Sequence, residues 1–299
     1  MMKIGLAGLG LMGAAIARRL IDTGHLITVY NRHSIKTGPF ANRGVAVAST
    51  PKELAQDSDF ILISVTNFIA VKEICFGNEG ILACNSKDFI VADTSTISPE
   101  ESKFCAQRFR EARIAMLGMP VMGGTTAAEN GELVPIICGS RKAFEKVAPI
   151  IKNISKAMFY LGERDGDASI LKLALNLNIG LIAGAMSEGI VLVRGAGIDP
   201  KMFIEILNST SIRTQLGEAK GPKMIANNFE PSFYLRNMLK DLDLAALSAQ
   251  TAGVSLPLTA LVQQMYRTAN NSGYSEQDYT AIAAFLMKIN GMETSDAPR

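Results

Sequence analysis

The chain is poor in the residues that build disulfide frameworks and metal sites. Its 299 residues include four widely spaced cysteines (Cys75, Cys84, Cys105 and Cys138) and two histidines, and no two cysteines have CxxC spacing. This pattern argues against a disulfide framework and against a structural zinc site, and it is typical of a reducing compartment. We therefore expect a cytoplasmic protein without a bound metal.

An excess of charge of one sign is also lacking. Thirty Lys and Arg residues stand against twenty-eight Asp and Glu residues, the net charge is +2, and there is no basic run. The sequence therefore offers no electrostatic basis for binding nucleic acid. The apolar N-terminal run has no cleavage region, so we expect a buried strand there rather than a signal peptide.

What the sequence does contain is a glycine turn between an apolar run and an amphipathic stretch. Lys3–Ala7 is a predicted strand, and Gly8, Gly10 and Gly13 follow it in GxGxxG spacing. Gly8 allows a tight turn, Gly10 lets the backbone approach a pyrophosphate, and Gly13 lets the helix pack closely on the strand. The free N–H groups at the helix start would hold the pyrophosphate. This context favours a dinucleotide site over a merely structural turn.

The residues after the second predicted strand, Leu26–Tyr30, indicate which dinucleotide binds. An NAD-binding unit has an acid there to bond the ribose 2′-OH. Here the chain continues Asn31-Arg32-His33-Ser34, with Lys36 beyond, and no acid is present. Asn31 and Ser34 can bond a 2′-phosphate, and Arg32 can pair with it or stack on adenine. Arg32 and Lys36 can also be ordinary solvated charges, but the missing acid favours NADP(H) over NAD(H).

The order of elements predicts two domains. Residues 1–162 alternate short β-rich runs with helical stretches, which predicts an α/β Rossmann domain with a doubly wound, mostly parallel sheet that binds NADP. Residues 163–299 predict an all-α domain for substrate binding and oligomerisation, joined by a long interdomain helix. Asn31, Ser64–Thr66 and Asp93–Thr96 follow predicted strands, and the carboxyl ends of such strands form one crevice. The predicted strands are Lys3–Ala7, Leu26–Tyr30, Val45–Ala48, Phe60–Val65, Phe89–Ala92, Ile114–Leu117, Val134–Cys138 and Ala157–Leu161.

The interdomain helix is predicted from Ala168 to about Arg194, in a stretch with few polar residues. Its length would suit a membrane span. Lys172, Asn176, Asn178 and Glu188 interrupt it, so we expect a buried helix and no membrane partner. Further helices are predicted at Asp199–Ser209, Tyr234–Gly253, Pro257–Ser272 and Ser275–Lys288.

Lys172 and Asn176 are the candidate reacting groups on this helix. They are four residues apart and therefore project from one face. A lysine and an amide on an apolar helix are costly unless they have a function. A buried ammonium can act as a proton donor or acceptor, and Asn176 can hold a substrate hydroxyl or orient the lysine. The alternative is that Lys172 extends to solvent near the helix start.

The ordered set of motifs resembles the β-hydroxyacid dehydrogenase family, which includes 3-hydroxyisobutyrate dehydrogenase and tartronate semialdehyde reductase. The resemblance implies an NADP(H)-dependent oxidoreductase, with a 6-phosphogluconate dehydrogenase-like C-terminal domain, that interconverts a small β-hydroxyacid and its semialdehyde or ketone by hydride transfer. Lys172 would be the general acid and base. The matching segments are Gly8–Gly13, Asp93–Pro99, Pro120–Gly124, Gly166–Lys172 followed by Asn176, Gly195–Asp199 and Leu239–Leu242.

The resemblance also implies roles for single residues. Ser95 would contact the substrate and Thr96 the cofactor, the backbone amides of Gly123 and Gly124 would hold a carboxylate, and Lys240 would reach the cofactor and substrate cleft. The predicted catalytic residues are Lys172 and Asn176. The predicted substrate-binding residues are Ser95, Met122, Gly123 and Gly124. The predicted cofactor-binding residues are Gly8, Gly10, Leu11, Met12, Gly13, Asn31, Arg32, Val65, Thr66, Thr96 and Lys240.

Several positions depart from the family pattern and leave the substrate open. Gly118 and Met122 stand where the family commonly has Asp and Ser, and Ala168 and Leu175 replace a glycine and an asparagine. A methionine cannot donate a hydrogen bond, so we expect a more apolar pocket that still takes a small carboxylate-bearing substrate.

Three further expectations concern the class of protein and its assembly. An imine reductase-like enzyme and a non-catalytic dinucleotide-binding protein remain as alternative functions. The apolar C-terminal helices indicate a homo-oligomer, either a dimer or a tetramer.

Overall fold

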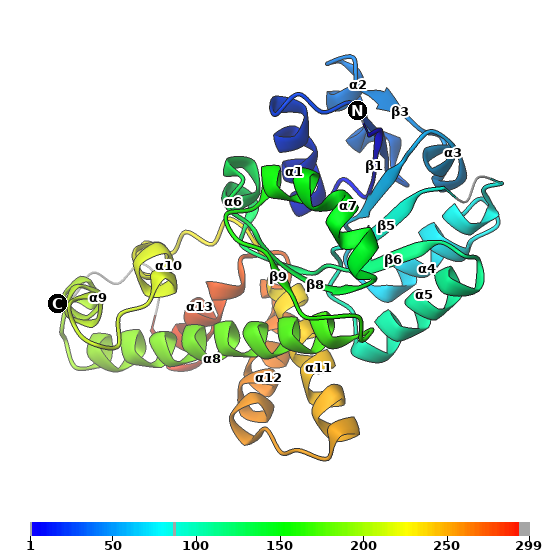
Figure 1. Ribbon diagram of the computed structural model, residues 1–299. Coiled ribbons are helices and arrows are strands. Elements are labelled where there is room, and N and C mark those ends of the chain that lie inside the picture. Colours follow the sequence, from blue (N-terminus) through cyan, green and yellow to red (C-terminus); the bar gives the residue numbers. More distant parts are fainter. Residues whose placement is uncertain (1, 86–87, 293–299) are drawn as a thin grey trace. The chain divides into compact units, whose positions relative to one another are not determined.

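The computed structural model describes residues 2–85 and 88–292 and divides into two compact units (Figure 1). The first unit extends to Lys172 and the second begins at Leu173, so the boundary falls inside helix α8 (Asp167–Gly195). Each unit has its own architecture, and each holds part of the predicted site.

The first unit is built on a nine-stranded sheet with the strand order β3-β2-β1-β4-β5-β6-β8-β7, and β9 pairs with β8. The strands from β1 to β6 pair in parallel, whereas β8 is antiparallel to β6 and β7. This confirms the predicted mostly parallel Rossmann sheet. The strands are β1 (Ile4–Ala7), β2 (Ile27–Tyr30), β3 (Ala46–Val47), β4 (Phe60–Ile63), β5 (Ile90–Asp93), β6 (Ala115–Gly118), β7 (Val121–Met122), β8 (Val134–Gly139) and β9 (Phe159–Tyr160).

Helices cover both faces of this sheet because its central strands are apolar on both sides. In β4, Phe60 and Leu62 join one buried cluster, and Ile61 and Ile63 join the other. Helices α1 and α7 pack on the first cluster, and α3, α4 and α5 pack on the second (Figure 1). The helices are α1 (Leu11–Asp22), α2 (Gly38–Ala41), α3 (Pro51–Gln56), α4 (Phe68–Phe76), α5 (Pro99–Glu111), α6 (Thr125–Asn130) and α7 (Arg141–Ile151), with 3₁₀ turns at Ser34–Lys36, Ile81–Ala83 and Lys152–Ile154.

The second unit is helical, as predicted, over its described residues. Its core joins Ala183 of α8 to Met238, Leu242, Tyr266 and Phe285. The helices after α8 are α9 (Pro200–Ser209), α10 (Gln215–Ile225), α11 (Leu235–Ala252), α12 (Pro257–Ala269) and α13 (Ile282–Ile289), with a π turn at Asn270–Tyr274 and a 3₁₀ turn at Tyr279–Ala281.

Two helix predictions need correction in this unit. Helix α10 is not among the predicted helices, and the predicted continuous helix Ser275–Lys288 is wrong. Gly273 has a φ of +96°, residues 275–278 are not helical, and the Asp278 side chain caps the short turn Tyr279–Ala281.

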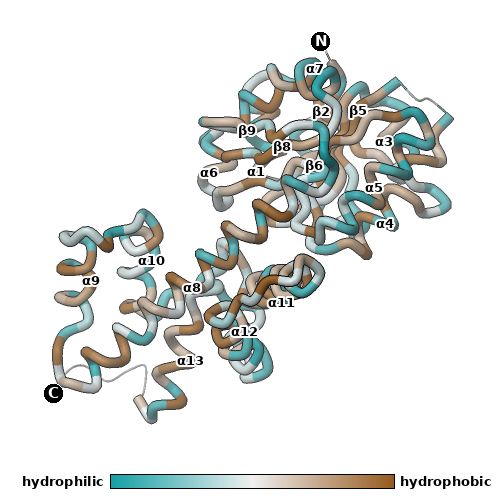
Figure 2. The backbone as a smooth tube through the Cα atoms, turned by 60° about the horizontal axis from the view of Figure 1, so that its bottom comes forward, coloured by the Kyte–Doolittle hydropathy of each residue, from teal (hydrophilic) through white to brown (hydrophobic). Residues whose placement is uncertain are grey.

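Helix α8 is the one helix in the described part of the chain whose length and composition suit a membrane span. Hydrophobic residues recur along its length (Figure 2), but Lys172 and Asn176 are buried on it. A core helix of a soluble protein has the same character.

Candidate functional site

The three glycines of the turn differ in their surroundings. Two of them are closely packed, and the third borders open space. Gly8 has a φ of +101°, and its N–H donates to the Tyr30 carbonyl at 2.9 Å. A Cβ on Gly8 would overlap the Ser64 carbonyl oxygen, and one on Gly13 would overlap the Gly8 carbonyl oxygen. A Cβ on Gly10, in contrast, would meet no protein atom within 4 Å. The fold therefore requires Gly8 and Gly13, whereas the open space at Gly10 suits a ligand.

The start of α1 fits a dinucleotide pyrophosphate. Gly10 is the N-cap, no side chain caps the helix, and its first turn holds no acid. The backbone N–H groups of Leu11 and Met12 are therefore available to an anion, which the positive end of the helix dipole attracts.

The Asn31 side chain lies at this turn and makes two hydrogen bonds there. Its Oδ1 accepts a hydrogen bond from the Leu9 N–H at 2.9 Å, and its Nδ2 donates to the His33 carbonyl at 3.0 Å. Asn31 thus ties the end of β2 to the glycine turn. Arg32 and Ser34 beside it are exposed.

The carboxyl ends of β4 and β5 meet through Ser95. The Val65 N–H donates to Ser95 Oγ at 3.1 Å, and the Ser95 N–H donates to Asp93 Oδ1 at 2.9 Å. The Ser95 hydroxyl keeps its own hydrogen for donation to a ligand. Thr66 is exposed and Thr96 half-buried beyond these strand ends. Ser64 also borders the glycine turn, so Asn31, Ser64 and Ser95 all lie at this edge of the sheet.

Lys172 lies against Met122, the last residue of strand β7. Its side chain is buried, with 8% exposed, and Nζ donates to Met122 Sδ at 3.2 Å. Lys172 therefore does not extend into solvent. The methionine itself packs against Ile136, Cys138 and Ala168.

The two glycines after Met122 expose their backbone. Gly123 has a φ of +121°, and Gly124 is the N-cap of α6 without a side-chain cap. A Cβ on Gly124 would meet nothing within 4 Å. These backbone groups suit a substrate carboxylate, as the sequence analysis expects of them.

In the second unit, Asn176 belongs to a buried polar group on α8 and α11. Asn176 is 3% exposed, and its Nδ2 donates to Asp241 Oδ2 at 2.5 Å. Lys240 Nζ lies 2.7 Å from Asp241 Oδ1. Asp241 lies in the Leu239–Leu242 motif but has no predicted role of its own, although an acid among the apolar positions Met238 and Leu242 of one helix face is a usable signal.

The cysteines and acids form no candidate metal centre. Among the described residues, no group of three or more His, Cys, Asp or Glu side chains could hold a metal ion. All four cysteines are buried and free. Burial, with the nearby Asp93 carboxylate, raises the pKa of Cys105 to about 12, so this thiol is a poor nucleophile.

Family models match both units. One described as the NAD binding domain of 6-phosphogluconate dehydrogenase matches residues 3–162. Another, described as NAD-binding of NADP-dependent 3-hydroxyisobutyrate dehydrogenase, matches residues 166–286. Together the two matches span the glycine turn, Ser95, Lys172, Asn176 and Lys240.

Individual relatives resemble the chain over nearly its whole length. The 2-hydroxy-3-oxopropionate reductase of Escherichia coli (strain K12) is 32% identical over 95% of this chain and 97% of the relative. The chloroplastic glyoxylate/succinic semialdehyde reductase 2 of Arabidopsis thaliana is 29% identical over 97% of this chain and 81% of the relative. Among solved structures, Psf3 in complex with NADP+ and 2-OPP has a TM-score of 0.88 at 25% identity, covering 95% of this chain and 99% of that chain.

Proposed function

We propose that this chain, which belongs to the β-hydroxyacid dehydrogenase family and is an NAD(P)-dependent oxidoreductase acting on hydroxyl groups, interconverts a small β-hydroxyacid and its semialdehyde or ketone. The observation that carries the proposal is the burial of the Lys172 ammonium against Met122, directly before the two glycines where a substrate carboxylate would bind. A buried lysine ammonium can act as a proton donor, and its neutral amine as a proton acceptor.

The residues of the chain would act in a short sequence. The backbone groups of Gly123 and Gly124 and the Ser95 hydroxyl would orient the acid group of the substrate. Bound NADP(H) supplies the hydride in reduction and accepts it in oxidation. Lys172 would donate a proton to the developing alkoxide oxygen, and in the reverse direction the neutral amine would take that proton back. Asn176 would hold the same oxygen through its amide.

We further propose that NADP(H) is preferred over NAD(H). Arg32 is exposed at the end of β2, and the residues that follow this strand, Asn31–Ser34, include no acid that would repel a 2′-phosphate. The description of the second family model and the NADP+ bound to Psf3 support this preference. Val65, Thr66, Thr96 and Lys240 would complete the cofactor contacts.

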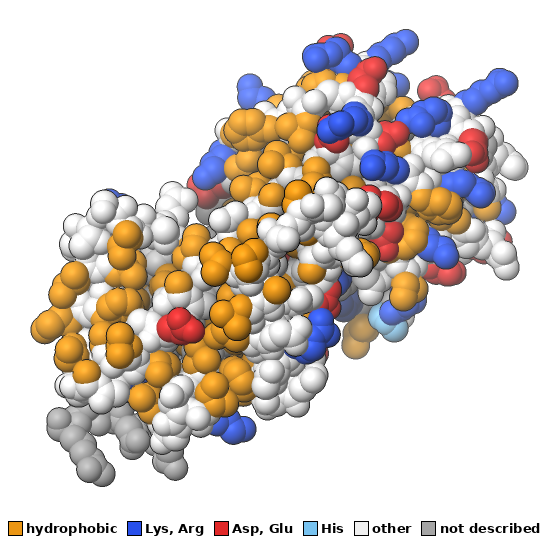
Figure 3. All heavy atoms as spheres, turned by 90° about the horizontal axis from the view of Figure 1, so that it is seen from below, with side chains coloured by type: hydrophobic (Ala, Val, Ile, Leu, Met, Phe, Trp, Pro, Cys, Tyr) orange, Lys and Arg blue, Asp and Glu red, His pale blue; other side chains and the backbone are white. Residues whose placement is uncertain are grey.

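We also propose a homo-oligomer, a dimer or a tetramer, working in a reducing, cytoplasmic compartment. The second unit exposes large apolar side chains, and such side chains gather on its face in Figure 3. Patches of this kind mark protein interfaces. Leu192, Met202, Ile206, Leu258 and Leu261 are among the exposed residues. The buried, unpaired cysteines support the compartment.

The test is steady-state kinetics on a panel of short semialdehydes, with cyclic imines included, using NADPH and NADH. A positioned general acid contributes about 10²–10⁴-fold, so Lys172→Ala should lower kcat at least 100-fold on that scale. Lys172→Arg should fail as well, because arginine does not readily give up its proton. Asn176→Ala should cost less. NADPH titration by fluorescence should show little change in cofactor affinity for any of these variants.

Near-normal turnover by Lys172→Ala would overturn the mechanism and favour a binding role. Turnover of imines alone would overturn the substrate class.

A further inference from the structure

We propose that Asp241 is a positioning residue that sets the orientation of the Asn176 amide for the reaction. The inference rests on the proposed function, because Asn176 is taken there to hold the reacting oxygen. Asp241 itself is not assigned any contact with substrate or cofactor.

The Asp241 carboxylate is buried in a way that needs an explanation. It is 2% exposed on α11, with Leu239 and Leu242 buried beside it on the same helix. A buried carboxylate is costly unless it is paired and hydrogen-bonded. Its two oxygens have separate partners: Lys240 Nζ lies 2.7 Å from Oδ1, and Asn176 Nδ2 lies 2.5 Å from Oδ2. Lys240 balances the charge, and the second oxygen is committed to the amide.

This contact selects one of two amide orientations. An ionised carboxylate only accepts hydrogen bonds, so the nitrogen of Asn176 must face Asp241 and the amide oxygen must face away. The second Nδ2 hydrogen then remains as a donor in a fixed direction. Without Asp241 the amide can turn by 180° and present its oxygen, which cannot donate to a substrate oxygen. Asp241 thus determines whether Asn176 is a donor.

Asp243, two residues further along α11, provides a matched control. Its side chain is 40% exposed, and its Oδ1 accepts from Gln263 and Arg267 of α12 at 2.5 Å each. Asp243→Asn removes the same charge from the same helix without touching Asn176.

The first experiment is a double-mutant cycle with NADPH and the best semialdehyde of the panel. Asp241→Asn should lower kcat about 10- to 100-fold, since a hydrogen bond to a charged group is at stake. In the Asn176→Ala background the same substitution should change kcat less than twofold, because its effect passes through the amide. Asp243→Asn should retain near-wild-type kcat. Equal losses from Asp241→Asn in both backgrounds would overturn the proposal and make Asp241 a direct substrate contact.

A swapped pair separates positioning from mere packing. Asn176→Asp combined with Asp241→Asn keeps the hydrogen bond and the charge but places a carboxylate, which cannot donate, at position 176. The swap should restore Tm relative to either single variant and leave kcat at least tenfold below wild type. Recovery of both Tm and kcat would show that the contact is structural only.

The second readout does not depend on turnover. In the ¹H–¹⁵N spectrum of the whole protein, the Asn176 side-chain NH₂ pair is identified by its loss in Asn176→Ala. Its exchange with solvent should be slow in wild type and in Asp243→Asn, and at least tenfold faster in Asp241→Asn. Unchanged exchange in Asp241→Asn would overturn the fixed orientation. Slow exchange in a protein that turns over no substrate would overturn the proposed function and would leave the Asp241–Asn176 contact as a structural one.

Discussion

The Lys172 ammonium donates to the thioether of Met122 at 3.2 Å, at the end of strand β7 and next to Gly123. A thioether is a weak acceptor and cannot donate, so Met122 offers little to a hydroxylated substrate. The same methionine packs on Ile136, Cys138 and Ala168, which makes this side of the site apolar. The contact therefore bears directly on which semialdehyde fits.

Met122→Ser should shift substrate preference toward small hydroxylated semialdehydes. The serine hydroxyl would supply a donor and remove apolar bulk, so kcat/KM for tartronate semialdehyde should rise several-fold, while that for a less hydroxylated semialdehyde should fall. A neutral hydrogen bond contributes about 0.5–1.5 kcal/mol, which sets the size of the gain. Met122→Leu is the control and should gain nothing. A wild-type enzyme that already works best on tartronate semialdehyde would contradict this role for Met122.

Gly10 and Gly13 should respond differently to the same added methyl group. In Gly10→Ala the Cβ meets no protein atom, so the free energy of unfolding should fall by less than about 1 kcal/mol while NADPH affinity falls at least about tenfold. In Gly13→Ala the Cβ overlaps the Gly8 carbonyl, so unfolding should become easier by about 1–3 kcal/mol or more. Urea denaturation and NADPH titration measure the two effects. Unchanged NADPH affinity in Gly10→Ala would show that the open space at this glycine does not hold the pyrophosphate.

Substitutions of Arg32 and of Asn31 should have different effects on the affinities for NADPH and NADH. Arg32→Ala should weaken NADPH about 10- to 100-fold and NADH little, because a charge-assisted contact to the 2′-phosphate is lost. Asn31→Ala should weaken both cofactors to a similar extent, because the Asn31 amide holds the Leu9 N–H of the shared glycine turn. Lys36→Ala is an exposed control nearby. Equal losses for both cofactors in Arg32→Ala would remove the basis for NADP(H) preference.

The elements predicted correctly from the sequence are those whose residue pattern is complete within a short segment. The glycine turn of Gly8–Gly13 and the apolar strands are complete within a few residues, and the structure contains them with ends shifted by one or two positions. Strand β7 (Val121–Met122) is too short to show a pattern and exists because it pairs with β8. Such pairing cannot be read from two residues.

Contacts between distant segments account for the other differences. Helix α10 contains Gly217, Gly221 and Pro222, which disfavour a helix, yet a Cβ on Gly221 would lie 2.9 Å from Ile204, so close packing on α9 explains the glycine. Asn31 was expected at a phosphate, but its amide is held by residues 22 positions earlier and two later. The role inferred for Asp241 depends on its hydrogen bond with Asn176, which is 65 positions away in the sequence.

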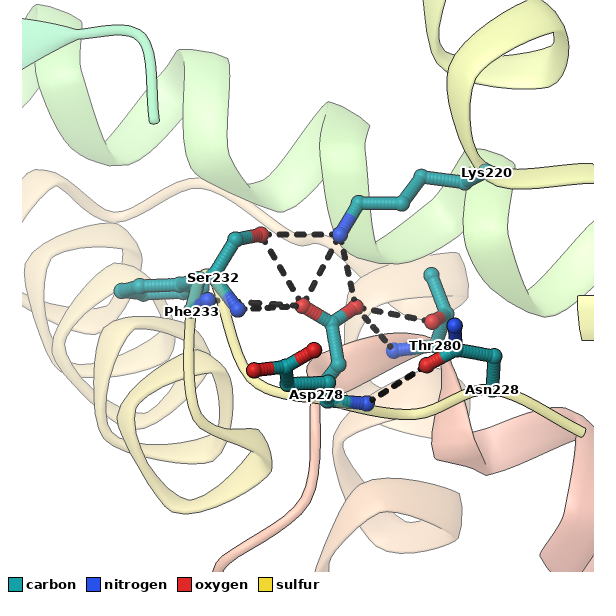
Figure 4. A network of polar contacts seen from close by, with 7 residues as sticks. Lys220, Asn228, Ser232, Phe233, Asp278 and Thr280 are labelled. Atoms are coloured by element: carbon teal, nitrogen blue, oxygen red, sulfur yellow. Dashed lines mark hydrogen bonds and ion pairs between the residues drawn. The ribbon is translucent and has the colours of Figure 1, made fainter. Parts of the chain in front are cut away.

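A buried ion pair fixes the segment between α10 and α13 (Figure 4). Lys220 Nζ lies 2.9 and 2.8 Å from the two carboxylate oxygens of Asp278, which is almost fully buried. The same carboxylate accepts from the Ser232 N–H at 3.0 Å and from the Thr280 hydroxyl at 2.8 Å. One carboxylate thus joins three stretches of chain.

Lys220→Met should destabilise the protein more than a change of surface charge does. Removing one partner of a buried pair leaves an uncompensated charge and typically costs about 3–5 kcal/mol. Lys223→Met, three residues further on the exposed side of α10, is the matched control and should cost less than about 0.5 kcal/mol. Urea denaturation at pH 7 measures both. Equal midpoints for the two variants would mean that the pair contributes nothing to stability.

The Asp278 carboxylate should also make stability depend on acid pH. Burial alone would raise the pKa of Asp278, but the hydrogen bond and charge of Lys220, with the Thr280 and Ser232 contacts, outweigh burial and lower it. The unfolded chain then binds this proton at a higher pH than the folded protein does, near pH 4. The contribution of Asp278 is therefore fully present above that pH and is lost as the pH falls through the lower folded value.

Asp278→Asn is the variant that isolates this contribution, because it removes the one titrating group in question. At pH 6 it should be less stable than wild type by up to about 3–5 kcal/mol, since the Lys220 ammonium, only 14% exposed, loses its charged partner. As the pH falls from 5 toward 3, the gap in the free energy of unfolding between wild type and variant should narrow, because wild-type Asp278 becomes protonated. Urea titrations at half-unit pH steps measure that gap. A gap that stays constant or widens toward pH 3 would show that the pKa of Asp278 is not lowered in the folded protein.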